Sequence, residues 1–257
     1  MELDVLFPDL SRRVDIPELM DDPACSEERL IRTVRRFALL NRLVARYRSV
    51  LTRWILKDML KRPGRVYRVA DLGAGGCDIP VWLLRRAQRA GLKLSVLAVE
   101  SNARVADIAR QRHRDTPGLS ISCQDATDLA ALGPVDYLIG NHFLHHLTDG
   151  DIKGLFTSAL NMRIRRFVFT DLARSHRAYY LHSILAALLF PRSFVGTDGR
   201  RSIRRGFRTA ELTALLAEAG IAHHVDVLRI APARIVVIGD TDDLAPEQGC
   251  CENANGR

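Results

Sequence analysis

The sequence has little that would place it in a membrane, in an oxidising compartment or around a structural metal. Its 257 residues contain no apolar run of about 18 residues, the length that a membrane-spanning helix needs. Its five cysteines lack the paired spacing of a zinc site. The last two, Cys250 and Cys251, lie in a polar tail, residues 241–257, that we expect to be disordered. We therefore expect a cytoplasmic protein without a bound metal.

Aromatic residues are also scarce, which affects how the net positive charge of the chain is interpreted. The chain has a net charge of +8, which would suit a nucleic-acid partner because lysine and arginine neutralise phosphates. Aromatic residues make up only 6% of the chain, and no basic stretch is interleaved with side chains on which bases stack. We expect solvated arginines on helix faces and no stable nucleic-acid partner.

Strand-like and helix-like segments alternate over most of the chain, which predicts an α/β fold. A helix over 209–220 is followed by two strand-like segments that resemble a hairpin. The pattern predicts a Rossmann-like, seven-stranded, mostly parallel sheet that ends in an antiparallel hairpin. The expected strands are 65–72, 93–100, 119–125, 135–141, 165–171, 223–230 and 234–239. The other helices expected between these strands are 79–91, 103–113 and 151–162.

Two segments fall outside this alternation. Residues 1–61, with a helix expected over 26–60, predict a helical N-terminal cap on the sheet domain of residues 62–257. Residues 172–208 form an insertion after the fifth strand, with an apolar helix over 177–190 followed by a basic, glycine-containing loop. We expect this insertion to form a lid or substrate wall, with a plain crossover helix as the alternative. Weak contact of 177–190 with a membrane surface stays open.

A glycine-rich turn, VADLGAGGCDIP at 69–80, joins the first strand to a helix and suggests a nucleotide site. A phosphate-binding loop would end in Gly-Lys-Ser/Thr, but Gly76 is followed by Cys77 and Asp78. A dinucleotide site needs a glycine where Asp78 stands, and this carboxylate would repel a pyrophosphate. The sequence therefore argues against NAD and FAD.

Acidic residues at three successive strand ends favour S-adenosylmethionine (SAM), which has no phosphate and carries a sulfonium and an ammonium group. Asp71 can accept a hydrogen bond from the ammonium, directly or through water. Glu100 can bind both ribose hydroxyls, and Asp125 can accept from the adenine amino group. The predicted cofactor contacts are Asp71, Gly73, Gly75, Asp78, Glu100, Ser101, Asp125, Ala126 and Asn141.

These residues resemble the cofactor motifs of class I SAM-dependent methyltransferases over about residues 65–240. More narrowly, five segments are similar to a group of bacterial methyltransferases of small molecules, often found beside polyketide and prenyl-quinone-like pathways. They are NRL (41–43), DLGAGGCDIP (71–80), NHFLHHL (141–147), TDLARS (170–175) and DGRRSIRRGFRTAEL (198–212). The resemblance implies SAM as cofactor and a small-molecule acceptor. Cys77 departs from that family, which usually has glycine there.

Three histidines follow the fourth strand, near the expected position of the methyl group. A phenol has a pKa of about 10, so a base helps its methylation, and histidine is the usual choice. We favour His145 and His142 as bases and place His146 at the acceptor; helix capping or bonding to the backbone is the alternative. The His145-His146 pair recurs in the resembled group, which favours a structural or cofactor-side role for at least one of them.

The segment after the fifth strand supplies further candidates. Asp171 is a candidate catalytic residue that orients the acceptor, although a structural pair with Arg174 is the preferred interpretation. Tyr179 is a candidate for an apolar acceptor wall, and Arg204 for binding an acidic acceptor. Core packing and a solvated loop are the respective alternatives.

The sequence thus predicts a SAM-dependent methyltransferase of secondary metabolism, a monomer or homodimer, that methylates a hydroxyl of an aromatic or polyketide-like small molecule. C- or N-methylation stays open, because these reactions share the cofactor half. RNA methylation is the other alternative, but NHFL differs from the Asn/Asp-Pro-Pro-aromatic stretch usual for adenine amino groups. Cytosine methylation would need a cysteine after the fourth strand, where only Cys250 and Cys251 lie.

Overall fold

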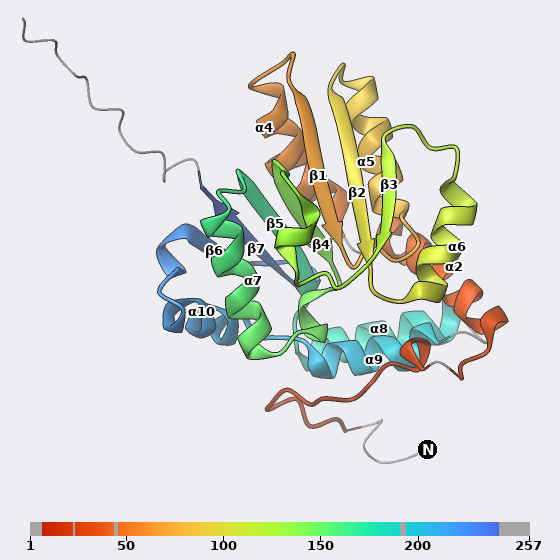
Figure 1. Ribbon diagram of the computed structural model, residues 1–257. Helices are drawn as coiled ribbons and strands as arrows, with labels where there is room; N and C mark the ends of the chain where they lie inside the picture. The colour runs from red at the N-terminus through yellow and green to blue at the C-terminus, as the bar shows by residue number, and fades with distance from the viewer. Residues whose placement is uncertain (1–6, 23, 44–45, 191–193, 242–257) are drawn as a thin grey trace, which may run out of the picture.

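The computed structural model describes residues 7–22, 24–43, 46–190 and 194–241 (Figure 1). Its seven-stranded sheet has the order β3-β2-β1-β4-β5-β7-β6. Strands β1 to β5 are parallel, whereas β7 runs antiparallel to both β5 and β6, so the predicted fold class is confirmed. The strands are β1 (Val66–Leu72), β2 (Lys93–Glu100), β3 (Leu119–Cys123), β4 (Tyr137–Asn141), β5 (Arg166–Leu172), β6 (Val225–Ile230) and β7 (Arg234–Asp240). The expected disordered tail lies outside the described residues except for Thr241.

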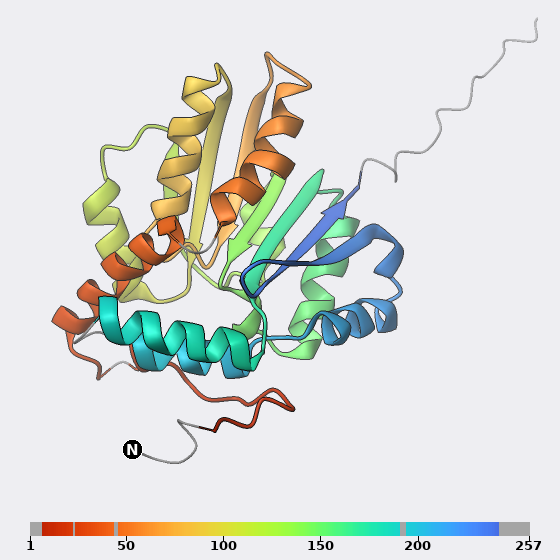
Figure 2. The ribbon, with the colours of Figure 1, turned by 180° about the vertical axis from the view of Figure 1, so that it is seen from behind.

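Helices cover both faces of the sheet, which Figures 1 and 2 show from opposite sides. On one face, helices pack on side chains of the central strands such as Tyr67 and Ile139. These helices are α3 (Tyr47–Leu51), the π-helical turn η2 (Thr52–Leu56), α4 (Lys57–Leu60) and α5 (Asp78–Arg89). On the other face, α7 (Asp149–Asn161) and α10 (Thr209–Glu218) enclose a cluster that includes Phe156, Phe167 and Phe169. Helix α6 (Ala103–His113) packs along β3.

The helix expected over 26–60 is divided in two. Helix α2 (Glu27–Leu43) is separated from α3 by Arg46, whose φ of 51° is left-handed and cannot continue a right-handed helix. Residues 44–45 lie outside the described residues. From Tyr47 to Leu60 the chain is helical throughout, so the sequence prediction missed only the break between α2 and α3.

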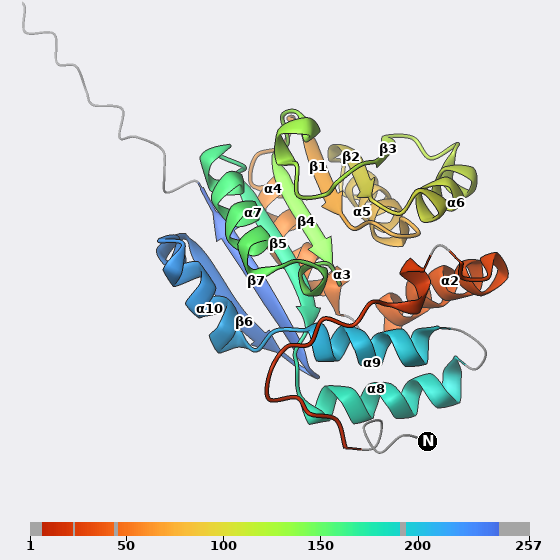
Figure 3. The same cartoon turned by 60° about the horizontal axis from the view of Figure 1, so that its bottom comes forward.

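The insertion after β5 forms two helices, α8 (His176–Leu189) and α9 (Val195–Arg205). The prediction of a loop for its second half was wrong, because a glycine there serves close packing rather than a turn. A Cβ on Gly199 would lie 2.0 Å from Nε2 of His182 on α8, so a larger residue there would displace the His182 ring. Figures 1 and 3 show α8 and α9 side by side, across the end of the sheet where the parallel strands finish.

The outer face of α8 carries exposed apolar side chains. They include Ile184, Leu188 and Leu189, and Leu188 is 73% exposed. Within the described residues, no helix combines the length and the apolar character needed to cross a bilayer. Contact of this helix with a membrane surface stays a prediction.

The N-terminal segment, residues 7–22, is irregular except for the 3-10 turn η1 (Leu19–Asp21) and runs along α9 (Figure 1). The buried Asp198 of α9 accepts hydrogen bonds from the backbone N–H groups of Leu19 (2.7 Å) and Met20 (3.1 Å). The guanidinium of Arg13 lies 3.6 Å from the ring centre of Phe207. Polar and cation–π contacts therefore hold this segment against the inserted helix.

The close approach of β5 and β7 predicts a stability effect. A Cβ on Gly239 would lie 1.9 Å from the ring of Phe167, so Gly239→Ala should lower the free energy of unfolding by about 1–3 kcal/mol. The control is Gly154→Ala in the exposed middle of α7, where a Cβ meets nothing within 4 Å. It should raise stability by up to about 1 kcal/mol. Urea unfolding measures both, and equal stabilities would contradict the packing argument.

Candidate active site

One cavity of about 340 Å³ lies at the carboxyl ends of the strands. The strand order reverses between β1 and β4, which is where ligands of open α/β sheets bind. The lining joins the glycine turn, residues 73–76, to Glu100 after β2 and to His142 after β4. Leu181 and Leu185 of α8 and Glu18 of the N-terminal segment complete the wall. A single space therefore borders both the predicted cofactor region and the predicted acceptor region.

Most of the predicted cofactor contacts line this cavity; Asp71 and Asp125 do not. Asp71 is buried. Asp125 is exposed, and its Oδ1 accepts hydrogen bonds from the backbone N–H and the hydroxyl of Thr127, both at 2.8 Å. In the structure this carboxylate stabilises its own turn, and its contact with adenine stays a prediction. The residues that line the cavity are Gly73, Gly75, Asp78, Glu100, Ser101, Ala126 and Asn141.

The glycine turn uses backbone conformations that suit glycine. Gly73 and Gly75 have φ values of 67° and 53°, and a Cβ on Gly73 would lie 2.9 Å from the ring of Phe143. A Cβ on Gly75 would meet nothing within 4 Å, so its backbone is open to a ligand. Cys77 is also left-handed, with φ 58°, which explains why glycine suits this position. Its buried side chain packs with Ala98.

The acids around the turn favour a cationic ligand. Glu100 accepts from the backbone N–H groups of Gly75 and Asn102, both at 2.9 Å. Burial raises the pKa of Glu100; burial and the charges of Asp78 and Glu100 raise the pKa of Asp71 well above its usual range. A sulfonium and an ammonium would relieve this repulsion, whereas a phosphate would increase it. The donor set therefore fits SAM.

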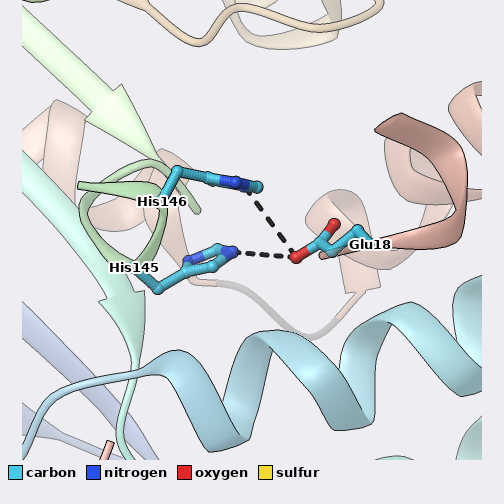
Figure 4. A group of neighbouring side chains, drawn as sticks. All are labelled: Glu18, His145 and His146. Atoms are coloured by element: carbon cyan, nitrogen blue, oxygen red, sulfur yellow. Dashed lines mark hydrogen bonds and ion pairs between the residues drawn. The ribbon is translucent and has the colours of Figure 1, made fainter. Parts of the chain in front are cut away.

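His145 lies at the centre of a buried ion network (Figure 4). It belongs to the 3-10 turn η4 (Leu144–His146), and its Nδ1 is 2.8 Å from Oδ1 of Asp171. Its Nε2 is 3.2 Å from Oε1 of Glu18. Burial lowers the pKa of His145, but the charges and hydrogen bonds of Asp171 and Glu18 outweigh burial and raise the pKa to about 9. A ring that is protonated and bonded at both nitrogens is not free to act as a base.

Asp171 therefore pairs with His145, and the preferred pairing with Arg174 is corrected. The buried guanidinium of Arg174 instead binds Glu211 and donates to the backbone oxygen of Leu10 at 3.0 Å. The charge of His145 overcomes the effect of burial and holds the pKa of Asp171 below its usual range. Asp171 does not line the cavity, so its position fits a role in orienting His145.

The other two histidines both border the cavity. Nε2 of His142 accepts a hydrogen bond from Nη1 of Arg234 at 3.0 Å, so the lone pair that a base needs is engaged. Burial and the charge of Arg234 lower the pKa of His142 well below its usual range. Burial and the charge of His145 lower the pKa of His146 to about 4, so this ring is neutral at physiological pH. The assignment of a catalytic role to any of the three histidines stays a prediction.

Two predicted acceptor contacts lie outside the cavity lining. Tyr179 is buried in a cluster with Leu10 and Ile203, which is the core-packing alternative. Arg204 lies on the helix α9, and its backbone oxygen accepts from Val14 of the N-terminal segment at 3.3 Å. Tyr179 therefore packs in the core of the helix pair, and Arg204 lies on a helix where a loop was expected; their contacts with an acceptor stay predictions.

Several polar residues of the cavity were missed from the sequence, Glu18 and Arg234 among them. Glu18 is buried although it comes from an irregular segment far from the glycine turn. Arg234 of β7 is only 4% exposed and also donates to Oδ1 of Asn141 at 2.6 Å. A lone acid in an irregular segment and a lone arginine beside an apolar strand give no local signal of function.

Comparison with known proteins shows what the domain and its fold are similar to. Residues 69–162 match the family model described as a methyltransferase domain. No sequence among the curated proteins matches the chain. The human N-acetylserotonin methyltransferase in complex with SAM is similar in fold, with a TM-score of 0.60 at 15% identity over 92% of this chain and 64% of that one. Residues 69–162 are thus similar to a methyltransferase domain, the fold is similar to that of a SAM-binding methyltransferase, and SAM is the cofactor that the residues of the site fit.

Two further solved structures have similar folds. The CMeT domain of the citrinin polyketide synthase has a TM-score of 0.53 at 16% identity, over 72% of this chain and 50% of that chain. Magnesium protoporphyrin IX methyltransferase from Synechocystis PCC 6803, with bound SAH, has a TM-score of 0.50 at 14% identity, over 86% of this chain and 90% of that one. This chain matches only 50% of the citrinin domain and 64% of the human enzyme.

Substitutions of Glu100, the acid that ends β2, and of Asp125, the acid that follows β3, should affect cofactor binding differently. Glu100→Gln keeps the shape of a side chain that lines the cavity but removes its charge, so SAM affinity should fall about 10- to 100-fold. Asp125→Asn changes a carboxylate outside the cavity, and SAM affinity should change less than about threefold, within the range of a remote polar change. Isothermal titration with SAM measures both. A larger loss for Asp125→Asn would contradict the assignment of the two acids.

Proposed function

We propose that this protein methylates a hydroxyl group of a small, largely apolar acceptor, such as an aromatic or polyketide-like metabolite of secondary metabolism. The observation that carries the proposal is the continuity of the cavity. The glycine turn and Glu100 lie on one side, and apolar side chains of α8 lie on the other. A small molecule held there would meet the methyl group of the cofactor.

The acceptor side of the cavity is suited to an apolar ligand. Its lining includes Leu172, Ala178, Leu181, Leu185 and Ala233. Helices α8 and α9 and the N-terminal segment cover the carboxyl ends of the strands, so the reacting groups are shielded from water (Figure 3). N-acetylserotonin and magnesium protoporphyrin IX, which two structural neighbours carry in their names, are both ring compounds of low molecular weight.

The chain mainly has to hold the acceptor in place. When bound, SAM supplies a methyl group that is already activated by its sulfonium, so positioning gives much of the rate. A phenol still has to lose its proton. His142 and His145 are engaged by Arg234 and by two carboxylates, respectively. His146, whose ring is neutral and lies beside Glu18, is therefore the histidine left to contact the hydroxyl of the acceptor.

Methyl-labelled SAM tests this function directly. The purified protein is incubated with labelled SAM and, in separate reactions, with an organic extract of the host cells and with total RNA. We expect label in a discrete extractable compound, whose methyl ether is then identified by nuclear magnetic resonance. The Glu100→Gln variant serves as the control and should transfer much less label. Label in RNA, or in neither fraction, would refute the proposal.

The apolar wall makes a second prediction. Leu185 lines the cavity, whereas Leu188 on the same helix is exposed and does not. Leu185→Ala should lower kcat/KM for the extracted acceptor about tenfold or more, since a few methylene groups of apolar contact are lost. Leu188→Ala should leave kcat/KM unchanged, and SAM affinity should stay the same in both variants. Equal effects of the two substitutions would place the acceptor elsewhere.

A further inference from the structure

Three side chains of the cavity converge on one point: Glu18, His145 and His146 (Figure 4). One possible ligand atom from each side chain can be chosen so that the three atoms lie within 4.8 Å of one another. Oε1 of Glu18 is 3.2 Å from Nε2 of His145 and 3.9 Å from Nε2 of His146. The acid and the histidines are 127 residues apart in the sequence, so only the fold brings them together.

We propose that these three residues bind one divalent transition-metal ion, with two imidazole nitrogens and one carboxylate oxygen as ligands. All three line the cavity, so the remaining coordination positions of the ion face the space of the acceptor. Three protein ligands with an open position is the arrangement of catalytic rather than structural metal sites. The sequence led us to expect no metal, because its cysteines lack metal spacing and Glu18 is remote.

Neighbouring groups hold the three ligands in the orientation that a metal needs. Asp171 lies against Nδ1 of His145, which places the proton on that nitrogen and directs Nε2 towards Glu18. Such a carboxylate behind a histidine ligand is the usual outer partner in zinc sites. Glu18 accepts a hydrogen bond from the hydroxyl of Ser202 at 2.5 Å. The backbone oxygen of His145 accepts from Nε of Arg205 at 3.2 Å, which fixes the turn that carries both histidines.

The donor set selects the kind of ion. Two imidazoles and one carboxylate suit Zn²⁺ or Fe²⁺, whereas Mg²⁺ and Ca²⁺ prefer oxygen ligands. Metal–ligand bonds of about 2.1 Å place neighbouring ligand atoms about 3–3.5 Å apart. The pair Glu18–His145 already has this separation, and the Nε2 of His146 needs to approach Glu18 by less than about 1 Å.

The charge balance also favours a cation. Glu18 and Asp171 place two carboxylates against the two nitrogens of the His145 ring. The ion lies between Nε2 of His145 and Glu18, and any proton on that nitrogen leaves to solvent when the ion binds. The role of the ion, which rests on the proposed function, is to bind the acceptor oxygen and lower the pKa of its hydroxyl, whose proton then leaves to solvent.

Co²⁺ tests the site, because its visible absorption reports the ligands around it. The full-length protein is freed of metal with a chelator, dialysed and titrated with Co²⁺. We expect one ion per chain with the visible bands of nitrogen and oxygen ligands. Glu18→Gln and His146→Ala should each weaken binding at least tenfold. A near-ultraviolet thiolate band would show that cysteines bind the ion instead, and it would overturn the proposal.

The control is the double substitution His223→Ala/His224→Ala. These histidines are also adjacent, with ring centres 3.9 Å apart, but they lie outside the cavity. Their replacement should leave Co²⁺ binding unchanged. Circular dichroism and SAM affinity, expected to be unchanged in all variants, separate loss of a ligand from loss of the fold. The absence of bound Co²⁺, or equal binding by the wild type and by both cluster variants, would overturn the site.

The proposed metal site and the proposed function can be refuted independently of each other. Co²⁺ binding is measured without an acceptor, so the site stands even if the methyl-labelling experiment finds no product. Conversely, methyl transfer that resists chelation and tolerates Glu18→Gln would overturn the role of the ion, but it would leave the methyltransferase function intact.

Discussion

The buried contact of His145 with Asp171 and Glu18 is the interaction on which the active-site end of the molecule depends. It joins three parts of the chain: the strand β5, the turn after β4 and the N-terminal segment. All three side chains are at most 4% exposed. Removal of one partner from a buried ion network leaves an uncompensated charge, which typically costs about 3–5 kcal/mol. The arrangement of the polar side chains at the acceptor end of the cavity therefore depends on all three residues.

The two ends of the cavity differ in charge, and this difference matches the two ligands. Glu100 and Asp78 line the cofactor end, and the charges of both raise the pKa of the buried Asp71. Repulsion among these acids makes the site complementary to a positively charged ligand. Towards the acceptor, two rings, His142 and His146, are neutral, and leucines of α8 form the wall. These neutral rings and leucines are the features that support the proposed small, apolar acceptor.

Structural features that depend on residues close together in the sequence were predictable. The period of apolar residues predicted the strands, and the turn at 69–80 predicted the ligand end of the sheet, because both depend on neighbouring residues. The sequence did not show that Asp125 bonds its own turn, because strand-end position does not say which way a short side chain turns. Helix α9 was missed because Gly199 looks like a helix breaker, although its role is close contact with His182 of α8.

Features that depend on long-range contacts were not predictable. Glu18 and Arg234 reach the cavity from opposite ends of the chain, and neither belongs to a motif. The pairing of Asp171 with His145 rather than Arg174 is likewise decided by the fold, which places Glu211 beside the guanidinium of Arg174. A single sequence shows which residues are ionisable, but the partner of each one follows from tertiary structure.

Glu18 connects closure of the cavity with the chemistry inside it. The same segment is held to α9 by Asp198 through the backbone of Leu19 and Met20, and by Ser202 through the Glu18 carboxylate. Any cation bound between Glu18 and the two histidines would add a further bond across the same junction. By thermodynamic linkage, a ligand that favours the closed segment also binds more tightly when the segment is closed. Closure, exclusion of water and activation of the acceptor would then be one coupled event, with Glu18 as the shared residue.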